Sequence, residues 1–499
     1  MTAVGETVGT ITSARLVGPG DELLPHDGPF DVFLADGRIV DIAPAGALPS
    51  YGAVHDADGA WLIPGLWDHH VHVMQWSLTS QRAPLGHAES AAHAASIMGA
   101  APFVDGVRVG SGFRDAFWTD VPSLDLLDAA TGDIPTYLIN ADVHSVWLNT
   151  AALRREGFDA DGSGILREAP AFEVSRRLNA VDASTGDRLV AQMAADAASR
   201  GVVGLVDFDM AWNNEAWERR LAAGFDTLRV EFGIYPEHLP RAIAEGLRSG
   251  EPITGAASDL VRVGSLKVIT DGSLGTRTAA CSHAYPGDPL NHGLLTVEPA
   301  MLIELMREAT GAGLSCAIHA IGDIANSYAL DAFAVTGATG TIEHAQLVAH
   351  ADIPRFGRLG VSASVQPEHA LDDRDLTDTI WAGQTALAYP LAALADSGAN
   401  VLLGSDAPVS ALDPWAALAG AVFRARDGRE SWHPEQALDS RRALAASTHG
   451  GSSMPARLAP GAGADLVVCE SDPLTAGEAE LRGMRVRATL IGGRLTHVG

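Results

Sequence analysis

Two histidines on one short strand give this sequence its clearest chemical signal. The segment from Pro64 to His72 reads Pro-Gly-Leu-Trp-Asp-His-His-Val-His and follows an apolar run. Side chains two positions apart on a strand share a face, so His70 and His72 point the same way, with Asp68 one step behind them. Neutral imidazole is a common zinc ligand, and such a pair would supply half of a metal site. The plain alternative is a chance pair among 18 histidines.

A single lysine stands out next. Lys267 is the only lysine among 34 basic residues, and all the others are arginine. Only lysine offers a primary amine. An ammonium group at a metal site would suffer desolvation and cation repulsion, whereas a neutral amine can add carbon dioxide and become a carbamate that bridges two metals. The alternatives are an ion pair with Asp271 or Asp68, or compositional drift that left one lysine behind.

The elements that must position these residues are short apolar strands that alternate with helical stretches. This alternation indicates a parallel sheet with crossover helices, and the strands are rich in Val, Ile and Leu because both faces are buried. The expected strands are the one that carries His70 and residues 201–208, 227–235, 261–270, 314–319, 340–344, 360–366 and 400–404. Eight β/α units predict an α/β fold of the TIM (β/α)8 barrel type.

Both chain ends are rich in expected strands instead. These strands lie at residues 10–17, 31–35, 38–42, 464–469, 486–491 and 494–498, and Asp36-Gly37 predicts a hairpin turn. We therefore expect a small β-sandwich domain built from residues 1–63 and 455–499. The barrel would take residues 64–454, with an insertion at about 77–195 after the first strand, where the alternation is lost.

Side chains that could do chemistry gather at the carboxyl ends of the expected strands, where TIM barrels build their active sites. The set comprises His70, His72, Lys267, His319, His344 and Asp406. Singly, a histidine in an apolar strand is usually a satisfied core residue, and an aspartate after a strand is usually a helix cap. Four histidines, the only lysine and an aspartate at the strand ends of one barrel favour a metal site over coincidence.

Composition narrows the class of protein. Hydrophobic residues make up 47% and charged residues 19% of the 499 residues, enough for one large core and a smaller one. The net charge of −28 argues against nucleic acid or a membrane as partner, because both attract clustered cations. Three scattered cysteines and the lack of signal-peptide features favour a cytoplasmic location. We expect a small-molecule substrate, and the size class alone suggests a homodimer.

The motifs together resemble those of the metal-dependent amidohydrolase superfamily, and specifically its amidohydrolase-3 branch of YtcJ-like proteins. The resemblance covers essentially the whole length. The segments that carry it are residues 64–72, 266–267, 271–275, 318–323, 342–344, 364–367, 404–408 and, inside the insertion, 144–149. It implies a TIM barrel with a β-sandwich formed by both termini, which agrees with the strand pattern.

The resemblance also implies a ligand set. His70 and His72 would hold the more buried of two divalent metal ions, with zinc as the first expectation. His319 and His344 would hold the second ion, and a carboxylated Lys267 would bridge the binuclear centre. Asp406 would touch the metal and serve as the catalytic proton carrier, while Asp68 would orient a ligand. Because the branch need not always carry two metals, one or two ions per chain are expected, and manganese, iron or cobalt would also suit these ligands.

These features predict a hydrolase that cleaves an amide, formamide or carbamate-like C–N bond with a metal-activated water. An esterase or a cyclic-amide hydrolase would use the same site. A Schiff-base lyase using Lys267 would leave the histidines idle, and a non-catalytic metal-binding protein would not need Asp406. Candidate substrate-binding residues are His144, Trp147, Arg277 and Gln366. His369, shortly after Gln366 in the sequence, is a further candidate. Aromatic residues such as Trp147 are more often core than pocket wall.

Overall fold

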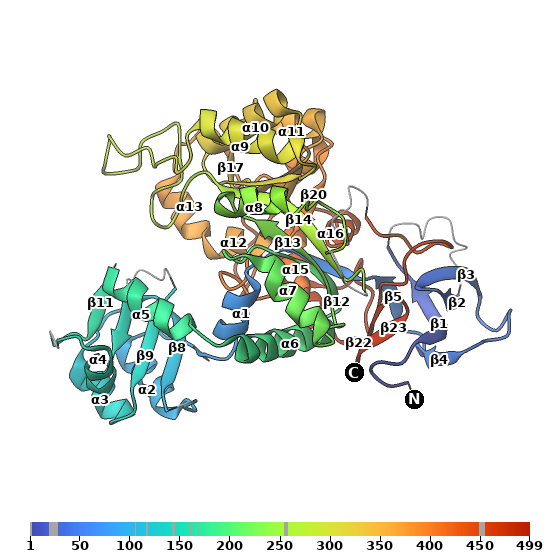
Figure 1. Ribbon diagram of the computed structural model, residues 1–499, viewed down its shortest axis with the longest axis horizontal. Helices are drawn as coiled ribbons and strands as arrows, with labels where there is room; N and C mark the ends of the chain where they lie inside the picture. The colour runs from blue at the N-terminus through green and yellow to red at the C-terminus, as the bar shows by residue number, and fades with distance from the viewer. Residues whose placement is uncertain are drawn as a thin grey trace. The chain divides into compact units, whose positions relative to one another are not determined.

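The computed structural model describes residues 2–18, 28–104, 106–115, 118–141, 145–159, 162–167, 169–253, 258–448 and 455–499. The chain forms two compact units, labelled by element in Figure 1. The larger unit consists of Met1–Val73 and Ala194–Gly499, and the smaller one of Met74–Met193. The finer domain boundaries expected from the sequence stay a prediction.

Eight parallel strands form a nearly closed barrel in the larger unit, and each lies where the sequence predicts a strand. In spatial order they are β6 (Leu66–Val71), β12 (Val202–Asp207), β13 (Arg229–Ile234), β14 (Val261–Ile269), β15 (Cys316–Ala320), β16 (Gly340–His344), β18 (Ser362–Val365) and β20 (Val401–Leu403). The backbone N–H of His72 donates to Ala407 (2.9 Å) and that of Asp406 donates to His70 (2.7 Å). These bonds bring the last strand back to the first, so the predicted TIM-like barrel is confirmed.

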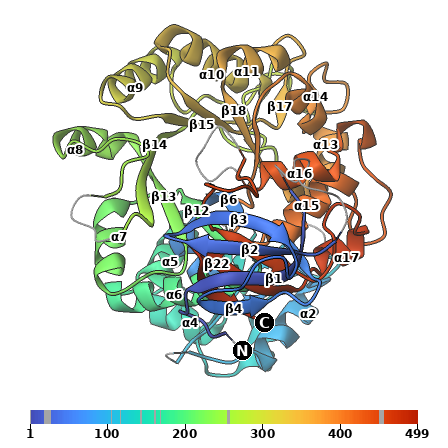
Figure 2. The ribbon, with the colours of Figure 1, turned by 90° about the vertical axis from the view of Figure 1, so that its right-hand side faces the viewer.

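Helices follow the barrel strands and lie around them in Figure 2. They are α7 (Asn213–Ala222), α8 (Leu239–Ala244), α9 (Pro299–Gly311), α10 (Asp323–Thr336), α11 (Ile353–Leu359), α12 (Pro367–Asp372), α13 (Arg374–Ile380), α14 (Leu391–Asp396), α15 (Pro414–Phe423) and α16 (Ser440–Ala446). A short ribbon pairs β17 (Leu347–Val348) with β19 (Leu387–Ala388). Gly337 and Gly360 end α10 and α11 in the left-handed conformation, which glycine adopts without a steric penalty.

The two chain ends meet in one β region of the larger unit. Its strands are β1 (Val8–Leu16), β2 (Phe30–Ala35), β3 (Arg38–Pro44), β4 (Ala53–Asp56), β5 (Trp61–Pro64), β21 (Leu466–Cys469), β22 (Val486–Ile491) and β23 (Arg494–Val498). The link between the ends is β5, which pairs with β1 and with β21. Helix α17 (Glu478–Arg482) lies between β21 and β22 in the chain. The pairing joins all eight strands into one sheet, and its folding into a two-layer sandwich stays a prediction.

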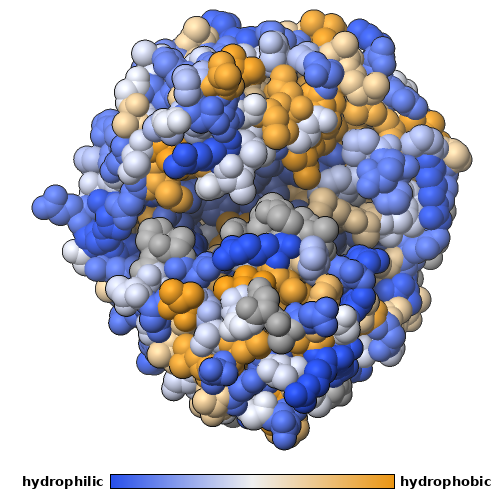
Figure 3. Space-filling model, turned by 90° about the vertical axis from the view of Figure 1, so that its left-hand side faces the viewer, coloured by the Kyte–Doolittle hydropathy of each residue, from blue (hydrophilic) through white to orange (hydrophobic). Residues whose placement is uncertain are grey.

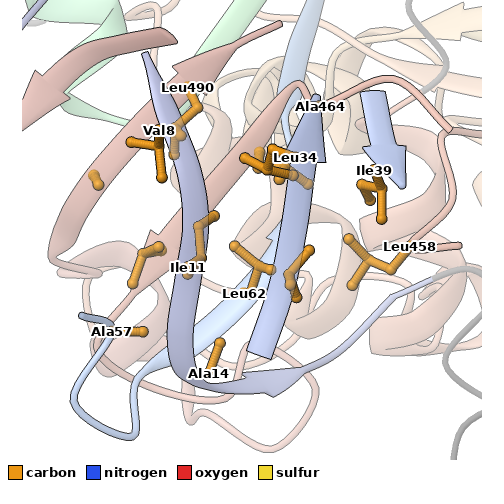
Figure 4. Close-up of a cluster of buried hydrophobic side chains, with 14 of the residues drawn as sticks. Val8, Ile11, Ala14, Leu34, Ile39, Ala57, Leu62, Leu458, Ala464 and Leu490 are labelled. Carbon is orange, nitrogen blue, oxygen red and sulfur yellow. The ribbon is translucent and has the colours of Figure 1, made fainter. Parts of the chain in front are cut away.

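A cluster of buried apolar side chains from both ends holds this β region together, as Figure 4 shows. Val8, Ile11, Leu62, Leu466 and Leu490 are each at most 1% exposed. Full burial of one such side chain contributes about 1.5–3 kcal/mol. The N-terminal and C-terminal segments therefore stabilise each other by burying their apolar side chains in one shared cluster.

The smaller unit has a sheet of its own. Its strands run in the order β11 (Ile165–Arg167), β10 (Ser145–Leu148), β9 (Thr136–Asn140), β8 (Arg108–Phe113) and β7 (Ala83–Pro84). The helices of this stretch are α1 (Val73–Thr79), α2 (Ala91–Ala100), α3 (Leu124–Thr131), α4 (Thr150–Glu156), α5 (Ala169–Asn179) and α6 (Ala183–Ser199). Ser90, Ser123 and Asn149 begin α2, α3 and α4 as N-caps, because their side-chain oxygens accept backbone N–H groups of the first turn.

The surface in view (Figure 3) is largely hydrophilic, and the three cysteines are free thiols. On the face shown in Figure 3, hydrophilic side chains predominate and hydrophobic ones form small separate groups. Cys281, Cys316 and Cys469 are all buried and unpaired. None of the helices in the described part of the chain combines the length and the apolar character that crossing a membrane requires.

Candidate metal centre

The carboxyl end of β6 carries His70 and, just beyond it, His72. Asp68 acts on the backbone here: its Oδ1 accepts the N–H of His70 (3.1 Å) and that of Ser405 (2.9 Å). Burial raises the pKa of Asp68 to about 6, although the hydrogen bonds from Ser405 oppose this. Asp68 thus ties β6 to the segment after β20 and fixes the backbone from which His70 projects.

Glu343 on β16 orients His70 from across the barrel. Its Oε2 accepts the Nδ1–H of His70 at 2.8 Å, and both side chains are 1% exposed. Burial, and then the charge of Lys267, lower the pKa of His70 to about 4. A neutral imidazole with its proton on Nδ1 presents the Nε2 lone pair, as a metal ligand must. Sequence reasoning assigned Glu343 no role, although its position beside His344 in a strand-end motif was a signal.

Asp406 places its carboxylate between several imidazoles. Oδ1 lies 3.5 Å from Nε2 of His70 and 3.4 Å from Nε2 of His72, and Oδ2 lies 3.9 Å from Nε2 of His369. Burial alone would raise the pKa of Asp406, but the surrounding imidazoles, His70 first and then the hydrogen bond from His72, outweigh burial and hold that pKa well below its usual range. Asp406 also has a left-handed backbone (φ 56°), and such strained backbone conformations are frequent at functional sites.

His344 ends β16 with its ring turned into the same group. Its ring centroid lies 4.9 Å from that of His70, and its own φ of 75° is left-handed. The Nδ1–H donates to Oε1 of Gln366 at 2.8 Å, which leaves Nε2 as the nitrogen with a lone pair. Burial, together with the neighbouring His319, holds the pKa of His344 well below its usual range. Gln366, expected at the substrate, instead binds His344 and donates to the Ser364 carbonyl (3.4 Å).

His319 on β15 lies beside His344, with ring centroids 4.5 Å apart. Its Nε2 lies 3.3 Å from Oδ1 of Asp271 and 3.5 Å from the carbonyl oxygen of Gly272. Asp271 in turn accepts the backbone N–H groups of Ala280, Ile321 and Gly322 at 2.9–3.0 Å. Because Nε2 faces acceptors, it carries the proton, and Nδ1 is the nitrogen that could bind a metal.

Lys267 on β14 is buried against an aromatic ring, with the carboxylates of Glu343 and Asp406 close enough to act on its charge. Its Nζ lies 4.5 Å from the centroid of the Phe208 ring, and its side chain is 1% exposed. Among the described residues, this Nζ has no hydrogen-bond partner, so the ion pair with Asp271 or Asp68 does not form. Burial lowers the pKa of Lys267 to about 8. Gly233 gives the ring its place, because a Cβ there would lie 2.6 Å from Cδ1 of Phe208.

The expected substrate-binding residues are spread over both units of the chain, with Trp147 in the smaller unit and Arg277 and Gln366 in the larger one. Trp147 belongs to the core of the smaller unit, where its ring lies 6.5 Å from that of Trp118. Arg277 is exposed in the loop after β14, and its guanidinium donates to the Pro286 carbonyl (3.4 Å). His144 lies outside the described residues. Gln366 lies at the candidate metal centre, where it supports His344.

A cavity of about 960 Å³ lies at the other, N-terminal end of the barrel strands. Its lining includes Trp67, Arg229, Glu231, Arg262 and Asp465. The guanidinium of Arg229 is already paired with the Asp465 carboxylate, at 2.5 and 3.2 Å. TIM barrels build their active sites at the carboxyl ends of the strands and use the N-terminal end for stability, so the cavity is not the chemical site.

The side chains at the carboxyl end fit a divalent metal ion. Two sets of three residues bring their ligand atoms within 4.8 Å of one another: His70, His72 and Asp406, and His344, His369 and Asp406. Within the described ranges, Nδ1 of His72, Nζ of Lys267 and Nε2 of His369 are buried without a hydrogen-bond partner. Buried polar atoms normally have partners, and imidazole nitrogens with a carboxylate are a donor set for zinc and similar ions.

The fold and this donor set define a TIM-barrel protein with a metal centre at the carboxyl ends of its strands. The chain belongs to the Amidohydrolase family, whose Amidohydro_3 model matches residues 53–497. As a member it is a hydrolase of the amidohydrolase type, and the donor set described above fits the divalent metal ion that this family implies.

Three curated proteins and one solved structure illustrate the similarity. Protein LONG AFTER FAR-RED 3 of Arabidopsis thaliana is 27% identical over 92% of this chain and 87% of its own length. The putative amidohydrolase YtcJ of Bacillus subtilis is 24% identical over 88% and 89%. N-substituted formamide deformylase of Arthrobacter pascens is 24% identical over 74% and 75%. An uncharacterized metal-dependent hydrolase from Pyrococcus horikoshii shares the fold, with a TM-score of 0.78, 24% identity and coverage of 94% and 99%.

Proposed function

We propose that this hydrolase cleaves a C–N bond of a small molecule, in an amide, a formamide or a carbamate-like group. The observation that carries the proposal is the Asp406 carboxylate, buried against the imidazoles of His70 and His72. A nitrogen leaving group must be protonated as it departs, and a carboxylate in this position can move that proton. The similarity to a protein named N-substituted formamide deformylase supports the same bond type.

The proposed ligands are those expected from the sequence: His70 with His72, His319 with His344, and Lys267 between them. A bound divalent ion, zinc in the first place, would lower the pKa of a water molecule and polarise the substrate carbonyl. Asp406 would accept the proton of the attacking water and donate it to the leaving nitrogen. Glu343 would keep His70 neutral and correctly turned, because its carboxylate holds the Nδ1 proton.

Lys267 would act as a carbamate. A pKa of about 8 leaves part of the buried amine neutral near pH 7–8, and Nζ has no partner in the described part of the chain. The lone pair of the neutral amine would form a bond to the carbon of carbon dioxide as one C–O π bond opens, and the nitrogen would lose one proton, so that a neutral amine becomes an anion with two oxygens. The neutral amine would equally suit a Schiff-base lyase, which is the competing function.

The decisive experiment compares the metal content of the wild type with that of Lys267→Ala, both purified without chelators. Arg262→Ala is the matched control, because Arg262 lies on the same strand at its opposite, solvent-exposed end. We expect about two ions per chain in the wild type and in the control, and at most about one in Lys267→Ala. Hydrolysis of N-formyl and N-acyl amines should fall roughly 1000-fold in that variant, since a metal supplies several kcal/mol to the transition state.

The other outcomes are equally informative. A wild type without metal would refute the hydrolase mechanism, and a borohydride-stable adduct of substrate on Lys267 would establish the lyase instead. Turnover of esters without any turnover of amides would refute the C–N bond. The small-molecule substrate, the homodimer and the cytoplasmic location stay predictions from the sequence.

A further inference from the structure

His369 is a buried imidazole that the metal chemistry expected from the sequence does not use. It lies in α12, directly after β18, and is 5% exposed. Its Nε2 has no hydrogen-bond partner among the residues that the structure describes. A buried polar atom without a partner calls for an explanation, and an absent ligand is one of the few that exist.

The atoms that face His369 are those of other candidate ligands. Its Nε2 lies 3.9 Å from Oδ2 of Asp406, and its ring is nearly parallel to that of His344, with centroids 6.2 Å apart. A separation of 3.9 Å is too long for a hydrogen bond. Two donors that each lie about 2.1 Å from one zinc ion can be up to about 4.2 Å apart, so the spacing suits two ligands of one ion.

The two carboxylate oxygens of Asp406 face different histidines. Oδ1 faces His70 and His72, whereas Oδ2 faces His369. The Asp406 backbone is fixed by the bond from its N–H to the His70 carbonyl (2.7 Å). The same carboxylate can therefore touch one ion with each oxygen.

Helix α12 is held firmly enough to present a ligand. Glu368, the residue before His369, receives hydrogen bonds from Arg426 and Arg482, both at 3.0 Å. Arg426 also donates to Asp372 at the other end of the helix (2.6 Å). Ligands must be held in place by their supporting contacts, and these ion pairs do so on both sides of His369.

We propose that His369 is a metal ligand, through Nε2, at a position that it shares with His344 and Oδ2 of Asp406. The inference rests on the proposed metal centre and extends its ligand set by one histidine. His369 then has a role at the metal rather than the substrate contact expected from the sequence. Gln366 completes the arrangement, because it holds Nδ1 of His344 and turns Nε2 toward the same place.

The test is a titration of chelator-stripped protein with Co²⁺, followed by its visible absorption. The variants are His369→Asn, which lacks an atom at the Nε2 position, and His350→Asn, an exposed histidine that serves as matched control. We expect two equivalents to bind to the wild type and to the control. In His369→Asn, one equivalent should bind at least about 100-fold more weakly, since loss of a supporting residue alone costs 10–100-fold.

Controls separate this inference from the proposed function. Equal melting temperatures of the metal-free proteins would show that His369→Asn is folded. Unchanged affinities and spectra in that variant would overturn the role of His369 while leaving the metal centre intact. A wild type that binds no Co²⁺ would overturn both.

A second measurement does not depend on the variant. Anomalous diffraction from wild-type crystals grown with Zn²⁺ should show a peak about 2.0–2.2 Å from Nε2 of His369. Peaks that all lie more than about 3.5 Å from this atom would overturn the proposal and make His369 a substrate contact.

Discussion

The two ends of the barrel treat buried charge in opposite ways. At the N-terminal end, Arg229 is paired with Asp465, and the same carboxylate accepts the backbone N–H of Gly492 (2.7 Å). At the carboxyl end, the described residues leave Nζ of Lys267 and Nε2 of His369 without hydrogen-bond partners. Arg229 and Asp465 thus satisfy each other within the protein, whereas Lys267 and His369 each carry a buried nitrogen that no described residue satisfies by a hydrogen bond.

The backbone shows the same contrast. His344, Ala345 and Asp406 have left-handed φ angles at the carboxyl end of the barrel. In the described part of the chain, no residue other than glycine has such an angle at the first position of a barrel strand. Each left-handed residue costs on the order of 1 kcal/mol, which a protein tolerates where geometry matters for function. The left-handed residues at the carboxyl end therefore lower the stability of the fold while they shape the site. The charge pair at the N-terminal end raises that stability.

The largest predicted effect breaks the site while leaving the stabilising end intact. In Glu343→Gln the amide no longer accepts the Nδ1–H of His70 with a charged oxygen, so His70 is held less well. Zinc affinity should fall about 10–100-fold, the range found when a residue that orients a ligand is removed. Competition with a chromophoric chelator measures the affinity.

Glu231→Gln is the matched control for this change, because Glu231 lies on β13 at the opposite end of the barrel. Its zinc affinity should equal that of the wild type. If both variants bind zinc like the wild type, then Glu343 only fills space and His70 is oriented by other contacts.

The sequence was a good guide to the barrel and a poor one to the smaller unit. Strands such as β14 and β16 are apolar runs followed by helical stretches. Because strands of a parallel sheet are buried on both faces, such runs predict strands directly. Strand β11 has only three residues, and Gly110 and Gly112 interrupt β8. Their pairing depends on contacts within the smaller unit that no local pattern reveals.

For the site, the sequence predicted which strand ends carry chemistry but not which side chains meet. His70 and Glu343 are 273 residues apart and lie on strands that are not neighbours in the sheet. Alternation along a strand gives the face of a side chain but not its partner across a barrel. Gln366 was therefore assigned to the substrate, although it binds His344. The left-handed turns at His344 and Asp406 also carry no sequence signal, because neither residue is glycine.

A change at the opposite end should lower stability without touching the metal. Asp465→Asn removes the charge that pairs with Arg229, a half-buried guanidinium. We expect a loss of about 2 kcal/mol in unfolding free energy, less than for a fully buried pair because both side chains keep some exposure. The melting temperature should fall by a few degrees, while zinc affinity stays within about two-fold. A large loss of zinc affinity would show that the two ends are coupled.

The smallest predicted effect depends on pH and concerns Glu231. Burial raises its pKa above the ordinary glutamate value to about 6, although Arg262 partly opposes this. The folded protein thus holds the proton more tightly than the unfolded chain does, so ionisation of Glu231 costs stability progressively from about pH 4.5 to pH 6 and by a constant amount at higher pH. Glu231→Gln removes this cost and should gain about 1–2 kcal/mol at pH 8 but almost nothing at pH 4.5.

Melting curves of the wild type and Glu231→Gln over this pH range measure the difference. The gap between the two proteins should open as the pH rises and stop growing above about pH 7. A gap that is equally large at pH 4.5 would mean that the glutamine packs better than the acid, independent of charge. A variant that is less stable at pH 8 would show that Glu231 belongs with the satisfied charges of its end, like Asp465, and would sharpen the contrast between the two ends of the barrel.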